Sequence, residues 1–67
     1  MNKFAERLKA LRIENELSQV QLAKETGLSK SAISFWEAGE RQPSAPAIIT
    51  LAKYFQVTTD YLLGLED

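Results

Sequence analysis

Few side chains in this 67-residue sequence are of a type that serves as a catalyst or a metal ligand. There is no Cys and no His, so disulfides, thiol chemistry, imidazole catalysis and the usual nitrogen or sulfur metal ligands are absent. The remaining candidates are Ser-Lys-Ser at residues 29–31 and the acidic pair Glu14 and Glu16. A nucleophile needs a base within hydrogen-bond reach inside a pocket, and a spacing of two separates the acids around a helix. We therefore expect no enzyme, no metal, no cofactor and no small-molecule substrate.

The charged residues are unevenly distributed along the chain. Eight Lys and Arg against nine Asp and Glu give a net charge of −1 and a pI near 5.3. Three of the acids, Asp60, Glu66 and Asp67, follow the last base, Lys53, so residues 1–59 carry eight bases and six acids, a net of +2. The overall charge disfavours a polyanion partner, but most of the acidic excess lies in the tail.

Length and hydropathy predict one small cytoplasmic domain over residues 1–67. A chain of 67 residues is near the lower limit for a core without disulfides or metals. No segment approaches the roughly 18 apolar residues of a membrane span, and the first residues alternate in charge where a signal peptide would become apolar. The segment 63–67 is compatible with a true terminus or with a cut before another domain.

Apolar spacing and capping residues predict two helices in the first part of the chain. Phe4, Leu8 and Leu11 recur at helical spacing, which indicates an amphipathic helix over about residues 2–15. Ser18-Gln19-Val20-Gln21 is a capping-box pattern and begins a second helix, at about residues 18–26. Gly27 ends that helix, because glycine adopts the left-handed conformation at little steric cost.

Three further helices follow, each preceded by a Ser or Thr N-cap. They are predicted at about residues 30–38, 45–55 and 59–63, after Ser29, Ser44 and Thr58. No strand pattern competes with them. The chain is therefore predicted to be all-α.

The second and third helices have the pattern of a helix-turn-helix. Two short helices flank Gly27 across a turn too tight for parallel packing. Ala23 supplies the small side chain where the helices touch, and Ile33 and Trp36 point inward to hold the second helix of the pair. The inward phase of Trp36 favours a core position over a stacking surface for nucleotide bases.

These residues resemble the lambda-repressor-like, Cro-type helix-turn-helix regulators of the XRE family, from about Phe4 to Gly64. The resemblance implies a compact five-helix DNA-binding domain whose third helix enters the major groove, bound as a dimer to two-fold related half-sites. The motifs that carry it are Leu17-Ser18-Gln19, Leu22-Ala23, Gly27, Ser29 through Ile33, Trp36-Glu37-Ala38-Gly39, Pro43-Ser44 and residues 57–64 (Val-Thr-Thr-Asp-Tyr-Leu-Leu-Gly).

The resemblance also implies roles for individual residues. Positions that read bases in the family are occupied here by Lys30, Ser31 and Phe35, and Ser34 is an expected helper. A lysine donates to guanine, a serine to either kind of base edge, and a phenylalanine offers only apolar contact, for example to a thymine methyl. The phosphate contacts are expected from Gln19, Ser29, Arg41 and Gln42.

Several of these assignments have alternatives. The family commonly places a polar or basic residue at the position of Phe35, so this ring either contacts the groove or covers the core or a partner protein. Gln19 could serve only its helix terminus, and Arg41 and Gln42 could be solvated. Arg12 and Glu37 occupy positions that carry an ion pair in the family, or they are two solvated charges.

The sequence therefore predicts a sequence-specific double-stranded DNA-binding regulator of transcription, expected to repress by occupying a promoter. A homodimer is expected through the C-terminal apolar residues Tyr61, Leu62, Leu63 and Leu65. The alternative is a protein-interaction module that kept the fold without binding DNA, which the acidic pI and Phe35 favour. Only DNA binding through phosphates weakens steeply with salt.

Overall fold

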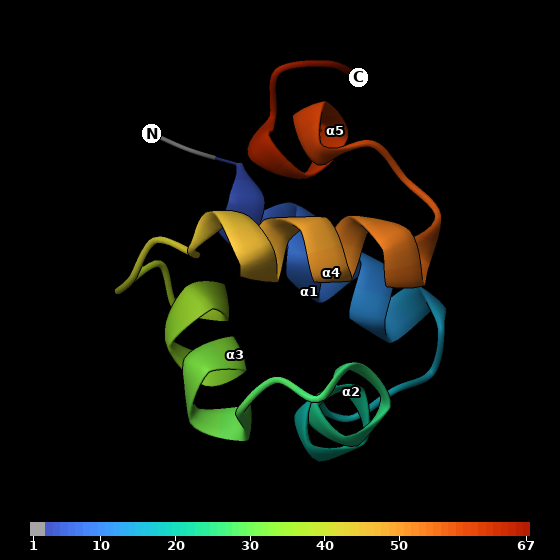
Figure 1. Cartoon of the computed structure of the whole chain (residues 1–67), viewed down its shortest axis with the longest axis vertical. Coiled ribbons are helices and arrows are strands. Elements are labelled where there is room, and N and C mark those ends of the chain that lie inside the picture. The colour runs from blue at the N-terminus through green and yellow to red at the C-terminus, as the bar shows by residue number, and fades with distance from the viewer. Residues whose placement is uncertain (1–2) are drawn as a thin grey trace.

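Five runs of apolar residues at helical spacing form five α-helices in the computed structural model, which describes residues 3–67. No strand occurs among those residues, so the all-α prediction is confirmed. Figure 1 shows the helices in chain order, and none of those described is long and apolar enough to span a membrane. Their bounds are α1 Phe4–Glu14, α2 Gln19–Thr26, α3 Lys30–Glu37, α4 Ala45–Phe55 and α5 Thr59–Leu63.

The helix bounds differ from the sequence prediction by a residue or two at some ends. The predicted beginning of α1 at residue 2 lies outside the described residues. Asn15 caps the end of α1 because the next residue, Glu16, has a positive φ of 57°, which a helix does not accommodate. Ala38 likewise caps α3, because Gly39 follows at φ +75°.

Hydroxyl side chains begin four of the helices. The Ser18 Oγ accepts a hydrogen bond of 3.0 Å from the Gln21 backbone N–H, and the Gln21 Oε1 accepts one of 2.7 Å from the Ser18 N–H, which confirms the capping box. Ser29, Ser44 and Thr58 each accept a hydrogen bond from the backbone N–H three residues on. Local sequence alone therefore specifies where α2 to α5 begin.

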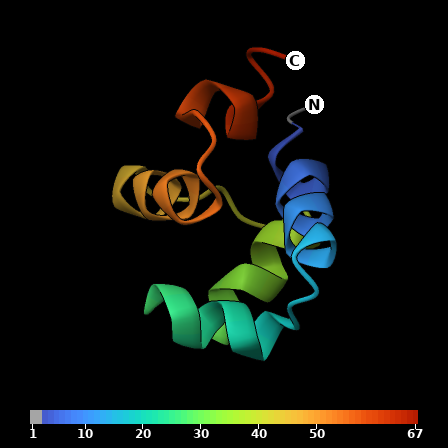
Figure 2. The same cartoon turned by 90° about the vertical axis from the view of Figure 1, so that its right-hand side faces the viewer.

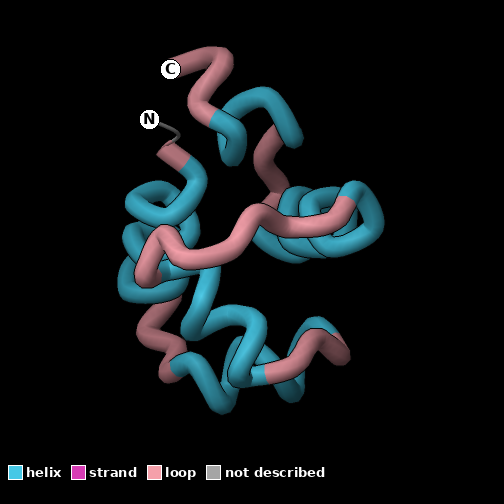
Figure 3. Tube along the Cα trace, turned by 90° about the vertical axis from the view of Figure 1, so that its left-hand side faces the viewer, coloured by secondary structure: helices cyan, strands magenta, loops and turns pink. Residues whose placement is uncertain are grey.

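The helices lie at the two ends of the domain and in a layer between them. In Figures 1 and 2, α2 and α3 lie at one end and α5 lies at the other, beside the C-terminus. Helices α1 and α4 occupy the space between them. Helix α3 packs on α1 and α2, and α5 packs on α1 and α4. Figure 3 shows that the loop after α3 runs from the α2–α3 end back to α4.

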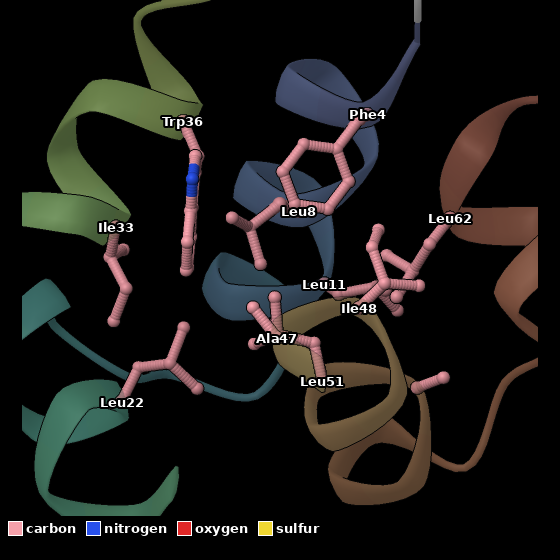
Figure 4. Close-up of a cluster of buried hydrophobic side chains, with 11 residues drawn as sticks. Phe4, Leu8, Leu11, Leu22, Ile33, Trp36, Ala47, Ile48, Leu51 and Leu62 are labelled. Carbon is pink, nitrogen blue, oxygen red and sulfur yellow. The ribbon is translucent and has the colours of Figure 1, made fainter. Parts of the chain in front are cut away.

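One apolar cluster fills the space between the five helices (Figure 4). Leu22 of α2 and Ile33 of α3 are fully buried, with 0% exposure, and Trp36 is 7% exposed. The Trp36 ring meets the Phe4 ring edge to face, with centroids 6.1 Å apart. The core position predicted for Trp36 is confirmed. The whole cluster comprises Phe4, Leu8, Leu11, Leu22, Ile33, Trp36, Ala47, Ile48, Leu51, Ala52 and Leu62.

The turn between α2 and α3 depends on a glycine and a threonine. Gly27 has φ +76°, and its N–H donates to the Ala23 carbonyl over 2.9 Å. The Thr26 Oγ1 donates to the Leu22 carbonyl over 2.8 Å and accepts from the Leu28 N–H at 3.3 Å. The Gly27 bond satisfies one of the last carbonyls of α2, and the Thr26 hydroxyl joins the last turn of α2 to the residue that leads into α3.

Two isoleucines provide a matched test of how α3 is held. We expect Ile33→Ala to lower the free energy of unfolding by about 2 to 5 kcal/mol, because it leaves a cavity beside Leu22 and Trp36. Ile13→Ala removes the same atoms from a side chain that is 56% exposed, and it should change the free energy of unfolding by no more than about 0.5 kcal/mol. Urea unfolding followed by circular dichroism measures both, and equal losses would contradict the position of α3.

Candidate nucleic-acid interface

Helix α3 has an inner face in the core and an outer face in solvent. Ile33 and Trp36 are buried, whereas Lys30 and Ser31 are exposed and Ser34 is half-buried. The Ser29 Oγ accepts from the Ala32 N–H at 2.9 Å, so this hydroxyl caps the helix while its own proton stays available to donate. The structure thus brings most of the predicted base-reading residues together on one exposed surface.

The first turn of α2 lies next to the C-terminal end of α3. The Gln19 Nε2 donates to the Glu37 Oε1 over 3.2 Å, so the side chain of Gln19 links α2 to the last residue of α3. The backbone N–H groups of Gln19 and Val20 have no acceptor within their own helix. The partial positive charge of a helix N-terminus suits an anion such as a phosphate.

Arg12 and Glu37 form a bidentate ion pair between α1 and α3. The Arg12 Nε lies 2.7 Å from Glu37 Oε2, and its NH2 lies 2.9 Å from Oε1. The side chains are 13% and 5% exposed, so these are not two solvated charges. The Arg12 NH1 also donates to the Leu17 carbonyl over 2.8 Å. The hydrogen bond to Glu37 raises the pKa of the Arg12 guanidinium above its ordinary value; burial opposes this shift, and the Glu37 charge adds to it.

This ion pair also removes a repulsive charge from the surface. Glu37 is the one acidic residue of α3, and Arg12 neutralises it on the inner side. The outer face of the helix therefore presents the Lys30 ammonium, serine hydroxyls and an aromatic ring to an approaching polyanion. This local balance differs from the net charge of −1 of the whole chain.

The end of α3 is closed by a Schellman motif that returns the chain toward the helix. The Glu40 N–H donates to the Phe35 carbonyl over 2.9 Å and the Gly39 N–H to the Trp36 carbonyl over 3.1 Å. Arg41 follows directly, and its guanidinium carbon lies 4.5 Å above the centroid of the Phe35 ring. Phe35 is 37% exposed and lies outside the buried cluster, so it does not cover the core.

The remaining predicted residues lie at the edges of this surface. Arg41 and Gln42 are both exposed in the loop after α3.

The residues that were candidates for catalysis lie in solvent. In the Ser-Lys-Ser segment, Ser29 caps α3 and Lys30 is exposed, and Glu14 and Glu16 are exposed as well. The described Asp and Glu residues form no group that could hold a metal ion.

The arrangement of α2 and α3 is that of a known family. The sequence model of the helix-turn-helix family matches residues 8–62 of this chain. The chain belongs to the lambda-repressor-like helix-turn-helix family. The five helices and the resemblance found in the sequence are thereby confirmed.

Relatives of this helix-turn-helix chain include named regulators. The HTH-type transcriptional activator BcrR of Enterococcus faecalis is 41% identical over 64 residues, which are 96% of this chain and 31% of BcrR. The HTH-type transcriptional regulator YobD of Bacillus subtilis (strain 168) is 36% identical over 64 residues, 96% of this chain and 57% of YobD. This chain thus spans between about a third and a little over half of those relatives.

A solved structure matches nearly the whole fold. The crystal structure of the P22 c2 repressor protein in complex with a synthetic operator superposes with a TM-score of 0.86 at 36% identity. The match covers 94% of this chain and 96% of that chain, and the repressor comes from Salmonella phage P22. The crystal structure of that protein therefore shows the fold described above in complex with an operator.

Two contacts of this surface do not follow from the sequence analysis. One is the hydrogen bond from Gln19 to Glu37, and the other is the stack of Arg41 on Phe35. A glycine four residues after Phe35 was a usable signal, because a Schellman turn at Gly39 returns the next residues to the last helical turn.

Removing Arg12 tests the ion pair. We expect Arg12→Ala to lower the free energy of unfolding by about 1 to 3 kcal/mol, because it removes both hydrogen bonds of the guanidinium to a nearly buried carboxylate and leaves Glu37 with Gln19 as its partner. Lys9→Ala is the matched control, since it removes one positive charge from an exposed position of the same helix. If both variants unfold at the wild-type urea concentration, the pair contributes no stability.

Proposed function

We propose that this chain binds double-stranded DNA sequence-specifically through α3 in the major groove and regulates transcription, as a repressor that occupies a promoter. The observation that carries the proposal is the two-sided character of α3. Its inner face and its only acid are held by the core and by Arg12, and its outer face is free of acidic residues. The operator complex of the P22 c2 repressor, with a TM-score of 0.86, supports the same use of the fold.

Four side chains of α3 are proposed to contact base edges. The Lys30 ammonium is suited to guanine O6 and N7, and the Ser31 and Ser34 hydroxyls can donate to or accept from either kind of edge. Phe35 has no polar atom, and its exposed edge is suited to apolar contact such as a thymine methyl. Lys30 and Ser31 are in the first turn of α3, the part of a recognition helix that reaches the bases.

Phosphate contacts are proposed on both sides of these residues. The Ser29 hydroxyl lies at the start of α3, and Gln19, at the N-terminus of α2, lies beside the last residue of α3, Glu37. Arg41 and Gln42 are exposed in the loop that follows the end of α3. Such contacts place the protein on the duplex without reading its sequence.

A homodimer is proposed through the C-terminal region. Leu62 is fully buried in the core and Tyr61 is half-buried against it, so these two face the protein itself. Leu63 and Leu65 are 36% and 73% exposed and are available to pair across a two-fold axis. Such a dimer would place two α3 helices in half-sites about one helical turn, or 34 Å, apart.

Selection of bound sites from random duplex DNA tests the proposal. We expect recovered sequences with two related half-sites and two protein chains per duplex by native mass measurement. Affinity should fall steeply between low and moderate salt, because phosphate contacts release counterions. No enrichment of any sequence would contradict DNA reading, and partner affinity without a salt slope would favour the protein-interaction module instead.

Two substitutions separate base reading from phosphate contact. Lys30→Ala should cost about 1 to 3 kcal/mol of binding free energy on the selected operator and much less on a scrambled duplex, if Lys30 reads a guanine. Gln19→Ala should weaken binding to both duplexes alike. Lys53→Ala, which removes an exposed charge from α4, is the control for general electrostatics. A uniform loss for Lys30→Ala would make Lys30 a phosphate contact.

A further inference from the structure

The three arginines of the described chain use their N–H groups differently. Those of Arg12 donate to the Glu37 carboxylate and to the Leu17 carbonyl. Arg7 lies 4.3 Å above the Tyr61 ring and also donates to the backbone carbonyls of Tyr61 and Glu66. Both of these guanidinium groups donate hydrogen bonds within the protein.

Arg41 is different, because it has an aromatic ring but no acceptor. Its guanidinium lies 4.5 Å from the centroid of the Phe35 ring, and among residues 3–67 it makes no hydrogen bond and no ion pair. A cation–π contact with a ring does not occupy the guanidinium N–H groups with a hydrogen-bond acceptor. The contact therefore restricts where the group lies while leaving its donors open to an external acceptor.

The Schellman motif explains why the two side chains meet. Gly39 adopts φ +75°, and the hydrogen bond from the Glu40 N–H to the Phe35 carbonyl brings the chain back past the last turn of α3. Arg41 is the next residue and so begins beside the Phe35 ring. The stack thus depends on backbone geometry that the helix terminus itself imposes.

We propose that Phe35 is a positioning residue, which holds the Arg41 guanidinium at the end of α3 for contact with a DNA phosphate. The inference rests on the proposed DNA binding and adds to it a role for the aromatic face of Phe35, distinct from any apolar contact of the ring edge with a base. A flexible exposed arginine loses rotamer freedom when it binds a phosphate. Stacking on Phe35 removes part of that freedom before binding, and affinity rises accordingly.

A double-mutant cycle on the selected operator tests the coupling. The variants are Phe35→Leu, which keeps an apolar side chain without a π face, Arg41→Gln, and the combination of the two. We expect Phe35→Leu to weaken binding about two- to fivefold when Arg41 is present, the factor that corresponds to an exposed cation–π contact. In the Arg41→Gln background the same substitution should cost less, and the difference between the two losses is the coupling between Phe35 and Arg41.

Three controls assign the cause of any loss. Phe35→Tyr retains the aromatic face and should restore wild-type affinity, whereas a merely structural role of the ring at this half-exposed position would not require a π system. Arg41→Gln should reduce the magnitude of the slope of log affinity against log salt concentration by about 1, the contribution of one phosphate contact. Both Phe35→Leu and Arg41→Gln should unfold at the wild-type urea concentration, because neither side chain belongs to the core.

The outcomes distinguish this inference from the proposed function. If wild-type protein binds the operator but the two single losses multiply in the double variant, the positioning role is wrong and DNA binding stands. A change in operator preference at one A·T pair without coupling to Arg41 would leave Phe35 with the base contact alone and would likewise overturn the inference. If wild-type protein binds no duplex in a salt-dependent way, the proposed function fails and the positioning role fails with it.

Discussion

The bidentate ion pair between Arg12 and Glu37 sets the direction of α3 relative to the rest of the domain. Its two hydrogen bonds require the guanidinium and the carboxylate to be nearly coplanar, which restricts the relative orientations that α1 and α3 can take. A pair this buried adds little stability over apolar side chains of the same size, since desolvation offsets the attraction. Its effect is on orientation. With Ile33 and Trp36 held in the core, the opposite face of α3 is left for solvent or for a ligand.

The same architecture explains how an acidic chain can present a surface suited to DNA. Asp60, Glu66 and Asp67 belong to α5 and the residues after it, and Figure 1 places that end of the domain away from α2 and α3. Glu37, which would otherwise repel phosphates at α3, is neutralised by Arg12. Charges beyond about 10 Å are largely screened at moderate ionic strength, so the local balance matters more than the net charge of −1.

Much of the fold could be predicted because it rests on local signals. The capping side chains at residues 18, 29, 44 and 58 act on backbone groups three positions away, and the glycine at 27 ends α2 through its own φ. Helical periodicity alone predicts the core positions of Ile33 and Trp36, because the spacing of three places both side chains on one face of the helix. The resemblance to lambda-repressor-like regulators added the candidate contacts of α3. Relatives named as an activator and as a repressor share this domain, so the domain itself does not determine the sign of regulation.

The sequence by itself determined the helices, their caps, the core and the absence of thiol and imidazole chemistry, because each of these depends on residue type and on spacing along one segment. Only the tertiary structure decided which partners the charged and aromatic side chains take. Gln19 donates to Glu37. The three arginines differ in their partners: Arg7 donates to a backbone carbonyl, Arg12 pairs with a carboxylate, and Arg41 lies over an aromatic ring. Phe35 was ambiguous in the sequence, and the chain reversal at Gly39 gave it an arginine neighbour. The contacts of Gln19, Arg7 and Arg12 join segments distant in the chain, and their geometry exists only once the helices have packed on the common core.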